Sequence, residues 1–247
     1  MPSVYLSPST QEYNPYITGN GSEEYFMNLI ADAMIPYLQA SGIQYGRNTP
    51  EMTAASSIAQ ANRGNYDFYL ALHSNASGPG NEGAARGIIA FYYPTSSNGR
   101  RGAEIFAENL RQIYPLPNRV TTRATTALGE VRQPNAPAVL IEIGYHDNIN
   151  DARWIEGNIN LIAQNLVMSL AEYFGIPFVY PGPASRGRVT TQSGALNLRD
   201  YPSMAGNVIA QIPNGTEVSV YGQYENWYVV QYGRQTGYAS ADYIQLI

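Results

Sequence analysis

The stretch Ala138-Val139-Leu140-Ile141-Glu142-Ile143 decides the fold class of this chain. Five apolar residues in a run of six are typical of a strand that is buried on both faces of a parallel sheet. A second run of this kind spans Phe68 to His73, and helical patterns lie between the two runs. Buried strands that alternate with helices predict an α/β domain, in which a mixed, mostly parallel sheet is covered by helices on both faces.

The segments around these two runs support the same interpretation. Apolar residues recur at three- and four-residue steps in four segments, which are therefore expected to be helices: residues 23–41, 51–63, 99–113 and 151–174. Short apolar runs at 4–7, 43–45 and 87–93 are expected to be further strands. Because ligands bind at the carboxyl ends of the strands in such sheets, three segments attract attention: 7–11, 73–75 and 142–144.

The sequence changes character after the last predicted helix. Residues 177–187 hold three prolines and two glycines, so they are expected to form an extended linker. Beyond the linker, short strand patterns alternate with turn signals such as Pro213-Asn214-Gly215, which predicts a small all-β barrel. We therefore expect an α/β domain over residues 1–176, the linker at 177–187, and the barrel over 188–247.

Composition excludes several classes of function. The 247 residues include no cysteine, so disulfides, cysteine-based zinc fingers and thiol nucleophiles are ruled out. A net charge of −5, without a run of like charges, argues against a protein that binds nucleic-acid phosphates. No apolar run reaches the roughly 18 residues of a membrane span. The first residues are expected to form a strand, and no secretion signal is visible in them.

Two histidines, His73 and His146, are the only residues available for imidazole chemistry. His73 ends a buried strand, where a side chain points toward the ligand-binding edge of the sheet, although a merely hydrogen-bonded loop histidine is the alternative. Glu142 lies within an apolar strand, and a buried carboxylate is costly unless it is paired or functional. Burial should raise its proton affinity, which suits a general base, and Arg132 is a candidate partner.

Four features, in this order along the chain, resemble the zinc-dependent N-acetylmuramoyl-L-alanine amidases of the amidase-3 family. A strand and a turn open the chain, and Glu24 precedes Asn28 by four residues on the first predicted helix. A strand then ends in His73-Ser74-Asn75-Ala76. Finally, residues 137–145 have the sequence Pro-Ala-Val-Leu-Ile-Glu-Ile-Gly-Tyr, with Arg132 shortly before them.

The resemblance implies an enzyme that cleaves the amide bond between N-acetylmuramic acid and L-alanine in peptidoglycan. It implies zinc ligands at Glu24 and His73 and a general base at Glu142. It places Asn75 and Arg132 near the site, as substrate contacts or supporting residues. The resemblance further implies action at the bacterial cell wall, with peptidoglycan as the partner; the sequence gives no oligomeric state.

One feature departs from the family pattern. The first zinc ligand of the family is a histidine, and the register puts Thr10 at that position. Gln11 is the first candidate to replace it, because its amide oxygen comes from the same turn. His146 is the second candidate and is otherwise expected to contact substrate, and Glu12 is the third. Water in the third position, or a metal other than zinc, is the remaining alternative.

The predicted barrel resembles a bacterial SH3 (SH3b) domain. The matching stretches are 194–199, 212–216, 227–230 and 237–239. The resemblance implies a module that holds the enzyme on peptidoglycan. Four aromatic residues are candidates to line a binding groove, with core packing as the alternative, which is preferred for the tryptophan: Tyr201, Tyr224, Trp227 and Tyr238.

Two other functions are compatible with the sequence. The missing first histidine is also expected in a degenerate protein that binds peptidoglycan without cleaving it. A metallo-carboxypeptidase-like enzyme that acts on the stem peptides is the third possibility, since the folds are related. Zinc content separates the first alternative from the amidase, and the identity of the peptide product separates the second.

Overall fold

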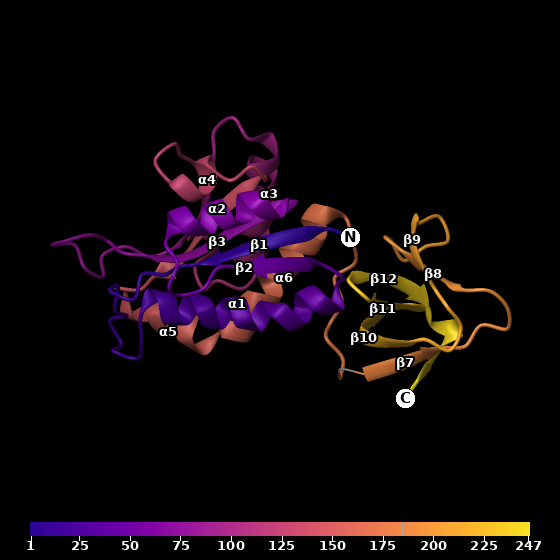
Figure 1. Cartoon of the computed structure of the whole chain (residues 1–247). Helices are drawn as coiled ribbons and strands as arrows, with labels where there is room; N and C mark the ends of the chain where they lie inside the picture. Colours follow the sequence, from indigo (N-terminus) through magenta and orange to yellow (C-terminus); the bar gives the residue numbers. More distant parts are fainter. Residues whose placement is uncertain (184) are drawn as a thin grey trace. The chain divides into compact units, whose positions relative to one another are not determined.

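The structure is a computed structural model that describes residues 1–183 and 185–247. These residues form two compact units. The larger consists of Ser3–Met34 and Tyr45–Tyr173, and the smaller of Met1–Pro2, Ile35–Gln44 and Phe174–Ile247. The larger unit contains a mixed sheet with helices, and the smaller one contains an all-antiparallel sheet (Figure 1).

The larger unit is built on six strands in the order β2-β1-β3-β6-β4-β5. The strands are β1 (Ser3–Pro8), β2 (Gln44–Arg47), β3 (Phe68–Asn75), β4 (Ile88–Tyr92), β5 (Val120–Ala124) and β6 (Ala138–Tyr145). β1 pairs with β3, β3 with β6 and β4 with β5 in parallel, whereas β4 and β6 are antiparallel. The predicted mixed, mostly parallel sheet is therefore confirmed.

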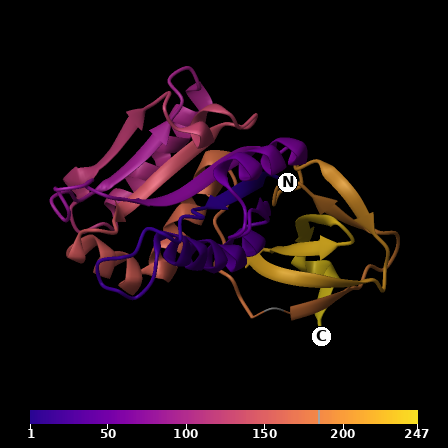
Figure 2. The same cartoon turned by 60° about the vertical axis from the view of Figure 1, so that its left-hand side comes forward.

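Helices lie on both sides of this sheet (Figures 1 and 2). They are α1 (Glu23–Ala40), α2 (Ala54–Gly64), α3 (Ser97–Arg111), α4 (Gly129–Arg132), α5 (Ile149–Gly157) and α6 (Ile159–Phe174), with a 3-10 turn, η1 (Pro117–Arg119). The helix predicted over 151–174 is in fact two helices, because the chain leaves helical geometry at Asn158. The sequence did not predict β5 or α4.

One face of the sheet carries the side chains that matter for the site. Tyr69 of β3 and Leu140 of β6 pack on this face with apolar side chains of α2 and α4. Side chains alternate across a strand, so His73 and Glu142 lie on the same face as Tyr69 and Leu140. In the parallel register of β3 and β6, His73 is directly opposite Glu142. The fold thus brings the two residues together from distant parts of the sequence.

The opposite face of the sheet packs against α3 and α6. The ring of Phe68 lies 5.9 Å from that of Phe106 in α3 and 4.6 Å from that of Tyr173 in α6, between ring centres. Gly102 allows α3 to come close, since a Cβ atom there would meet the Phe68 ring at 2.8 Å. Because α3 and α6 pack closely on this face, the polar side chains of the site lie on the other face, which carries His73.

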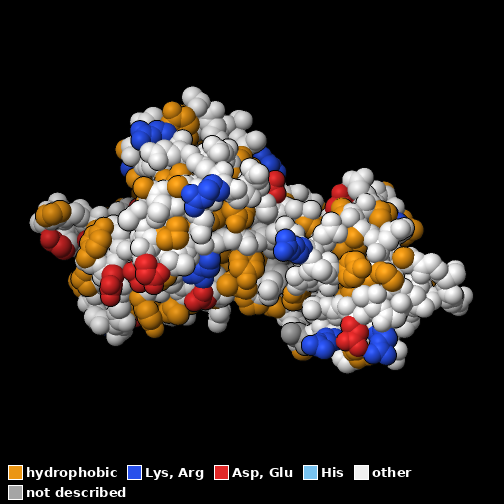
Figure 3. Space-filling view, viewed as in Figure 1, with side chains coloured by type: hydrophobic (Ala, Val, Ile, Leu, Met, Phe, Trp, Pro, Cys, Tyr) orange, Lys and Arg blue, Asp and Glu red, His pale blue; other side chains and the backbone are white. Residues whose placement is uncertain are grey.

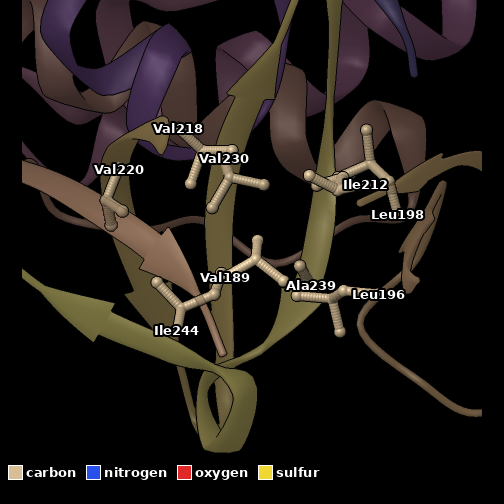
Figure 4. Packing of buried hydrophobic residues seen from close by; sticks show 9 residues of the cluster. All are labelled: Val189, Leu196, Leu198, Ile212, Val218, Val220, Val230, Ala239 and Ile244. Atoms are coloured by element: carbon tan, nitrogen blue, oxygen red, sulfur yellow. The ribbon is translucent and has the colours of Figure 1, made fainter. Parts of the chain in front are cut away.

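The smaller unit contains seven antiparallel strands in the order β13-β7-β10-β11-β12-β8-β9. They are β7 (Ser185–Val189), β8 (Leu196–Arg199), β9 (Val208–Ile212), β10 (Glu217–Tyr224), β11 (Trp227–Tyr232), β12 (Gln235–Ser240) and β13 (Ile244–Leu246), with a 3-10 turn, η2 (Ala241–Tyr243). Nine buried apolar side chains from these strands form its core (Figure 4). β7 begins inside the predicted linker, and the predicted domain boundaries stay predictions.

Basic and acidic side chains are interspersed on the face of the molecule shown in Figure 3. In the smaller unit, for example, Arg186 and Arg188 lie 3.9 Å and 2.8 Å from carboxylate oxygens of Glu217. Exposed pairs of this kind contribute little to stability. Within the described ranges, none of the helices combines the length and the apolar character that a membrane span needs.

Candidate active site

A cavity of about 540 Å³ opens where β1, β3 and β6 end. Its lining includes the turn after β1, with Thr10 and Gln11, together with His73, Glu142 and residues 127–130 at the start of α4. This is the edge of the sheet at which the sequence predicted a ligand site. The cavity therefore gathers polar side chains that come from several separate segments of the chain.

His73 is held between two carboxylates. Its Nδ1 atom lies 2.8 Å from Glu23 Oε1, and its Nε2 atom lies 2.9 Å from Glu130 Oε2. The exposed fractions of the three side chains are 12% for His73, 2% for Glu23 and 7% for Glu130, so solvent is largely excluded. Glu23 is the first residue of α1, where the helix dipole favours a carboxylate.

These contacts shift the protonation equilibria of the whole cluster. Burial alone would lower the pKa of the His73 imidazole, but the hydrogen bonds with Glu130 and Glu23 outweigh burial and raise this pKa. Burial alone would raise the pKa of Glu23 and of Glu130, but the hydrogen bonds with His73 hold both below their usual range. In the absence of a metal, His73 is therefore a cation between two anions.

Glu130 is held in place by two hydroxyl groups. Its Oε1 atom accepts hydrogen bonds from Ser7 Oγ and from the Tyr69 hydroxyl, both at 2.7 Å. Its other oxygen, Oε2, is thereby turned toward His73. The sequence did not point to Glu130, because it lies in a four-residue helix without a periodic pattern, where a glutamate is ordinarily solvated.

Gln11 Nε2 forms a triangle of polar atoms with His73 Nδ1 and Glu23 Oε1. Gln11 Nε2 lies 3.3 Å from His73 Nδ1 and 3.4 Å from Glu23 Oε1. Neighbouring ligands of one tetrahedral zinc ion, at bond lengths of about 2.0 Å, are separated by roughly 3.3 Å. The Gln11 oxygen accepts hydrogen bonds from the Tyr13 hydroxyl at 3.1 Å and from Asn14 Nδ2 at 3.3 Å. A half-turn of the amide would give up both and would place this acceptor beside His73 and Glu23 instead of the nitrogen. The spacing of the three groups thus fits one small cation.

The carboxylates of Glu23 and Glu130 contact different ring nitrogens of His73. In the part of the chain that the structure describes, no three His, Cys, Asp or Glu side chains are grouped to hold one metal ion. Glu23 faces Nδ1 and Glu130 faces Nε2, which lie on opposite sides of the ring. The donor set that fits a metal is therefore Gln11, His73 and Glu23, with an amide oxygen as the third donor.

Glu142 lies at this cavity with an unsatisfied oxygen atom. Its Oε2 atom is buried and, among the described residues, has no hydrogen-bond partner. Burial raises the pKa of this carboxyl to about 7, which the positive charge of His73 only partly opposes. An unpartnered acceptor in a cavity wall is suited to take a proton from a water molecule bound there. The raised proton affinity predicted from the sequence agrees with this environment.

Glu24, the residue predicted as a zinc ligand, lies outside this cluster. Successive residues of a helix are turned by about 100°, so Glu23 and Glu24 cannot face the same point. The charged neighbours of Glu24 are Glu12 and Glu51 rather than His73. Glu23, which the sequence interpretation did not single out, takes the position beside His73.

His146, the second candidate to replace the missing histidine, also lies apart from the triangle. Its Nδ1 atom is 2.9 Å from the backbone oxygen of Ser74, and its ring stacks on Tyr16 with centroids 5.8 Å apart. The residue is buried, and it fixes the end of β3 directly after His73. These contacts are those of a hydrogen-bonded structural histidine, and it is not among the residues that line the cavity.

The other predicted site residues are also absent from the cavity lining. The side chain of Asn75 accepts a hydrogen bond from the neighbouring Ala76 N–H at 2.8 Å. Arg132 is exposed on α4, where its guanidinium donates to the backbone oxygen of Thr126 at 3.4 Å. Glu12, the third candidate ligand, is exposed in the turn before α1.

The smaller unit has a cavity of its own, of about 550 Å³. Trp227, Tyr243 and Met204 supply apolar surface there, and Asp242 and Asn197 supply polar groups. Trp227 therefore lines a cavity, whereas the sequence favoured a place for it in the core. Tyr238, another candidate for the groove, is fully buried.

Two parts of the chain match known protein families. Residues 6–172 match the family described as N-acetylmuramoyl-L-alanine amidase. Residues 194–245 match the bacterial SH3 domain. The first match covers more than half of the chain and includes Gln11, Glu23, His73, Glu130 and Glu142.

Solved structures of amidases share the fold of the larger unit. The N-acetylmuramoyl-L-alanine amidase AmiC2 of Nostoc punctiforme is 18% identical, with a TM-score of 0.62 over 70% of this chain and 97% of that one. An N-acetylmuramoyl-L-alanine amidase from Clostridium difficile 630 is 19% identical, with the same TM-score and coverage. The catalytic domain of the CD27L endolysin, which targets Clostridia difficile, is 18% identical, with a TM-score of 0.57 over 70% and 98% of the chains.

A curated relative is similar over part of its length. Bacteriocin BCN5 from Clostridium perfringens is 25% identical over 126 residues. These residues are 49% of this chain and 14% of the bacteriocin, so the similarity concerns a small part of that protein.

Proposed function

Since this chain belongs to the N-acetylmuramoyl-L-alanine amidase family, we propose that it hydrolyses peptidoglycan with a zinc ion held by Gln11, His73 and Glu23. The bond cleaved joins the lactyl carbonyl of N-acetylmuramic acid to the amine of L-alanine. The observation that carries the proposal is the triangle of Gln11, His73 and Glu23 atoms beside the unpartnered oxygen of Glu142. The donor set has one imidazole, one carboxylate and one amide oxygen, so the site binds zinc without the family's first histidine.

Zinc, when bound, supplies a Lewis acid that polarises the substrate carbonyl and makes a water molecule more acidic. Glu142 accepts a proton from the attacking water as the oxygen atom of this water bonds to the carbonyl carbon. The bond between this carbon and the nitrogen of L-alanine breaks, and Glu142 returns the proton to the leaving amine. One water is consumed, and its second proton also ends on the amine, so the products are a lactyl carboxylate and a peptide with a protonated amino terminus.

The surroundings of Glu142 support its role as the base. Its strand neighbour in the register is His73, so the base and the proposed ligand lie side by side on adjacent strands. Its Oε2 atom accepts no hydrogen bond from the described part of the protein, so it can accept one from a bound water. A carboxylate whose pKa is raised to about 7 is a stronger base toward water than an ordinary glutamate, and its conjugate acid can still protonate a more basic amine.

The bacterial SH3 domain supplies the second part of the proposed function. We propose that it holds the enzyme on peptidoglycan, so that the protein acts at the bacterial cell wall. A cavity lined by Trp227 and Tyr243, with polar groups beside them, supports a role in binding. Aromatic side chains give a rigid contact surface at low entropic cost.

Digestion of purified peptidoglycan tests the proposed reaction. The protein is stripped of metal with a chelator and assayed before and after zinc is added, and the products are identified by mass spectrometry and by labelling of new amino groups. We expect new N-terminal L-alanine only after zinc is added, with the glycan strands intact.

Other products would favour the other functions. Peptides that lack their terminal residue would favour the carboxypeptidase-like enzyme. Zinc-loaded protein that binds peptidoglycan and releases no amino groups would contradict the proposal and favour the non-catalytic binder.

A further inference from the structure

The two ring nitrogens of His73 have different surroundings, and this difference bears on the proposed metal site. On the Nδ1 side lie Glu23 Oε1 at 2.8 Å and the Gln11 amide at 3.3 Å. On the Nε2 side lies Glu130 Oε2 at 2.9 Å. The Nδ1 side thus offers two further donor groups, which are themselves 3.4 Å apart. The Nε2 side offers one carboxylate in the described part of the chain.

We propose that Glu130 is the positioning residue of the metal centre. Its Oε2 atom accepts the hydrogen bond from His73 Nε2–H, and this contact fixes the tautomer that leaves the Nδ1 lone pair for the metal. A neutral imidazole carries one N–H, so the partner of one nitrogen decides the role of the other. The inference rests on the proposed function, because it concerns the zinc site formed by Gln11, His73 and Glu23.

The contacts of Glu130 suit it for this role rather than for direct coordination. Its Oε1 atom already accepts two hydrogen bonds at 2.7 Å, from Ser7 and from Tyr69. Ser7 lies on β1 and Tyr69 lies on β3, so two adjacent strands hold the carboxylate. With 7% of its side chain exposed, Glu130 has little freedom to turn toward the Nδ1 side of the ring.

The consequence of this arrangement is measurable in metal affinity. A carboxylate on the outer nitrogen of a ligating histidine orients the ring and makes the other nitrogen a stronger donor. Loss of such a partner typically weakens metal binding by roughly ten- to a hundredfold. Glu130 would therefore be needed for tight zinc binding, although it does not contact the metal.

Nitrogen-15 NMR of the full chain tests the tautomer directly. His73 and His146 are the only histidines, so labelled histidine gives two sets of ring signals, and a His146→Gln variant assigns them. On addition of zinc chloride we expect the Nδ1 signal of His73 to move to the metal-bound range, while Nε2 stays protonated. Zinc on Nε2 of His73 would overturn the inference.

Zinc titration by calorimetry gives the second readout. We expect Glu130→Ala to raise the Kd for zinc by roughly ten- to a hundredfold. Glu130→Gln keeps an acceptor for Nε2–H, so its affinity should fall less and its His73 tautomer should stay that of the wild type. Glu108→Gln, an exposed position on α3, is the control with wild-type affinity.

The outcomes separate this inference from the proposed function. Wild-type zinc affinity in folded Glu130→Ala would overturn the inference, and so would zinc on Nε2 in an active wild-type enzyme; both leave the amidase reaction standing. Thermal melts show whether Glu130→Ala folds. If it does not, the NMR spectra of the wild type and of Glu130→Gln test the inference, because both are expected to show zinc on Nδ1 of His73 and a protonated Nε2. A wild-type protein that binds no zinc would overturn both.

Discussion

Glu23 and Glu24 are adjacent, yet the structure gives their side chains different surroundings. The resemblance to the family selected Glu24 because it precedes Asn28 by four residues. In the structure, Asn28 donates hydrogen bonds to the backbone oxygens of Glu24 and Ser9, at 2.8 and 3.3 Å, so its amide nitrogen contacts the backbone of Glu24 and not the carboxylate. Two glutamates at the start of a helix are equally favourable in sequence terms, and only the direction in which the helix docks separates them.

Replacement of each glutamate by glutamine tests this assignment. We expect Glu23→Gln to lose more zinc affinity than the roughly 10- to 100-fold that loss of an outer partner costs, because a direct ligand is removed. Glu24→Gln serves as the matched control and should bind zinc and cleave peptidoglycan as the wild type does. The opposite ranking in a zinc titration would show that Glu24 is the ligand.

Gln11 is a neutral donor where the family has a histidine, and this suggests a gain-of-affinity variant. Gln11→Glu places an anionic oxygen in nearly the same position, and we expect zinc to bind about tenfold more tightly, or about 1.4 kcal/mol. Without metal, the new carboxylate lies near both the Glu23 carboxylate and the cationic His73, so repulsion and attraction oppose each other and the free energy of unfolding should change by less than about 1 kcal/mol. Calorimetry and thermal melts with and without zinc measure both effects, and unchanged zinc affinity would remove Gln11 from the ligand set.

The site residues differ in how far the sequence could reveal them. Glu142 and His73 stand at the ends of apolar strands, where a polar residue is conspicuous, and the structure brings both to the cavity. Glu130 lies in a short, irregular segment, and its place beside His73 depends on how α4 folds back over the sheet. His146 was noticeable because histidine is rare in this chain, but rarity does not determine which way a side chain points.

Among the helices and strands, the apolar patterns predicted the long ones, whereas they missed the short elements β5 and α4. The strands β3 and β6 and the helices α1 and α3 each have enough residues to display a repeating apolar pattern. β5 is an edge strand with the sequence Val-Thr-Thr-Arg-Ala, and α4 has four residues, so neither shows a pattern. The division between α5 and α6 was missed because the apolar spacing continues across Asn158.

The junction between β6 and α5 depends on one buried carboxylate, Asp151. Its oxygens accept hydrogen bonds from Arg86 Nε at 2.8 Å, the Tyr114 hydroxyl at 2.7 Å, Gly87 N–H at 3.1 Å and Tyr145 N–H at 3.2 Å. Asp151 has no exposed surface, so its carboxylate accepts these hydrogen bonds out of contact with solvent. The network ties the start of α5 to the end of the strand that carries Glu142.

Removal of this carboxylate should destabilise the α/β unit. We expect Asp151→Ala to lower the free energy of unfolding by about 3 kcal/mol or more, because it leaves buried donors and a partly buried arginine without their acceptor. Asn150→Ala, an exposed position in the same helical turn, should change it by less than about 0.5 kcal/mol. Urea denaturation measures both, and equal stability of the two variants would contradict the structural role of Asp151.

At the scale of the whole molecule, the chain joins an amidase domain to a bacterial SH3 domain. The change from helix-and-strand rhythm to short strands with turns made this division visible in the sequence. The same patterns could not show which aromatic residues remain accessible. Trp227 and Tyr238 lie on neighbouring strands, yet one lines a cavity and the other is buried.

The two domains should contribute separately to the activity. We expect Trp227→Ala to weaken sedimentation of the protein with intact peptidoglycan by about fivefold or more, because aromatic contacts dominate binding sites. Hydrolysis of a small soluble muropeptide should be unchanged. Tyr201→Ala removes an exposed aromatic outside the cavity lining and should bind as the wild type does. Unchanged sedimentation of Trp227→Ala would show that the surface that binds peptidoglycan does not include Trp227.

The proposed reaction depends on Glu142 as the base that activates water beside a zinc ion. The most direct measurement is the initial rate at which Glu142→Gln releases L-alanine amino groups from peptidoglycan, with its zinc content determined in the same sample. We expect wild-type zinc content and a rate lower by about 10²- to 10⁴-fold, because the proposed ligands remain and the base is lost. A zinc-loaded Glu142→Gln enzyme that works at the wild-type rate would contradict this role of Glu142.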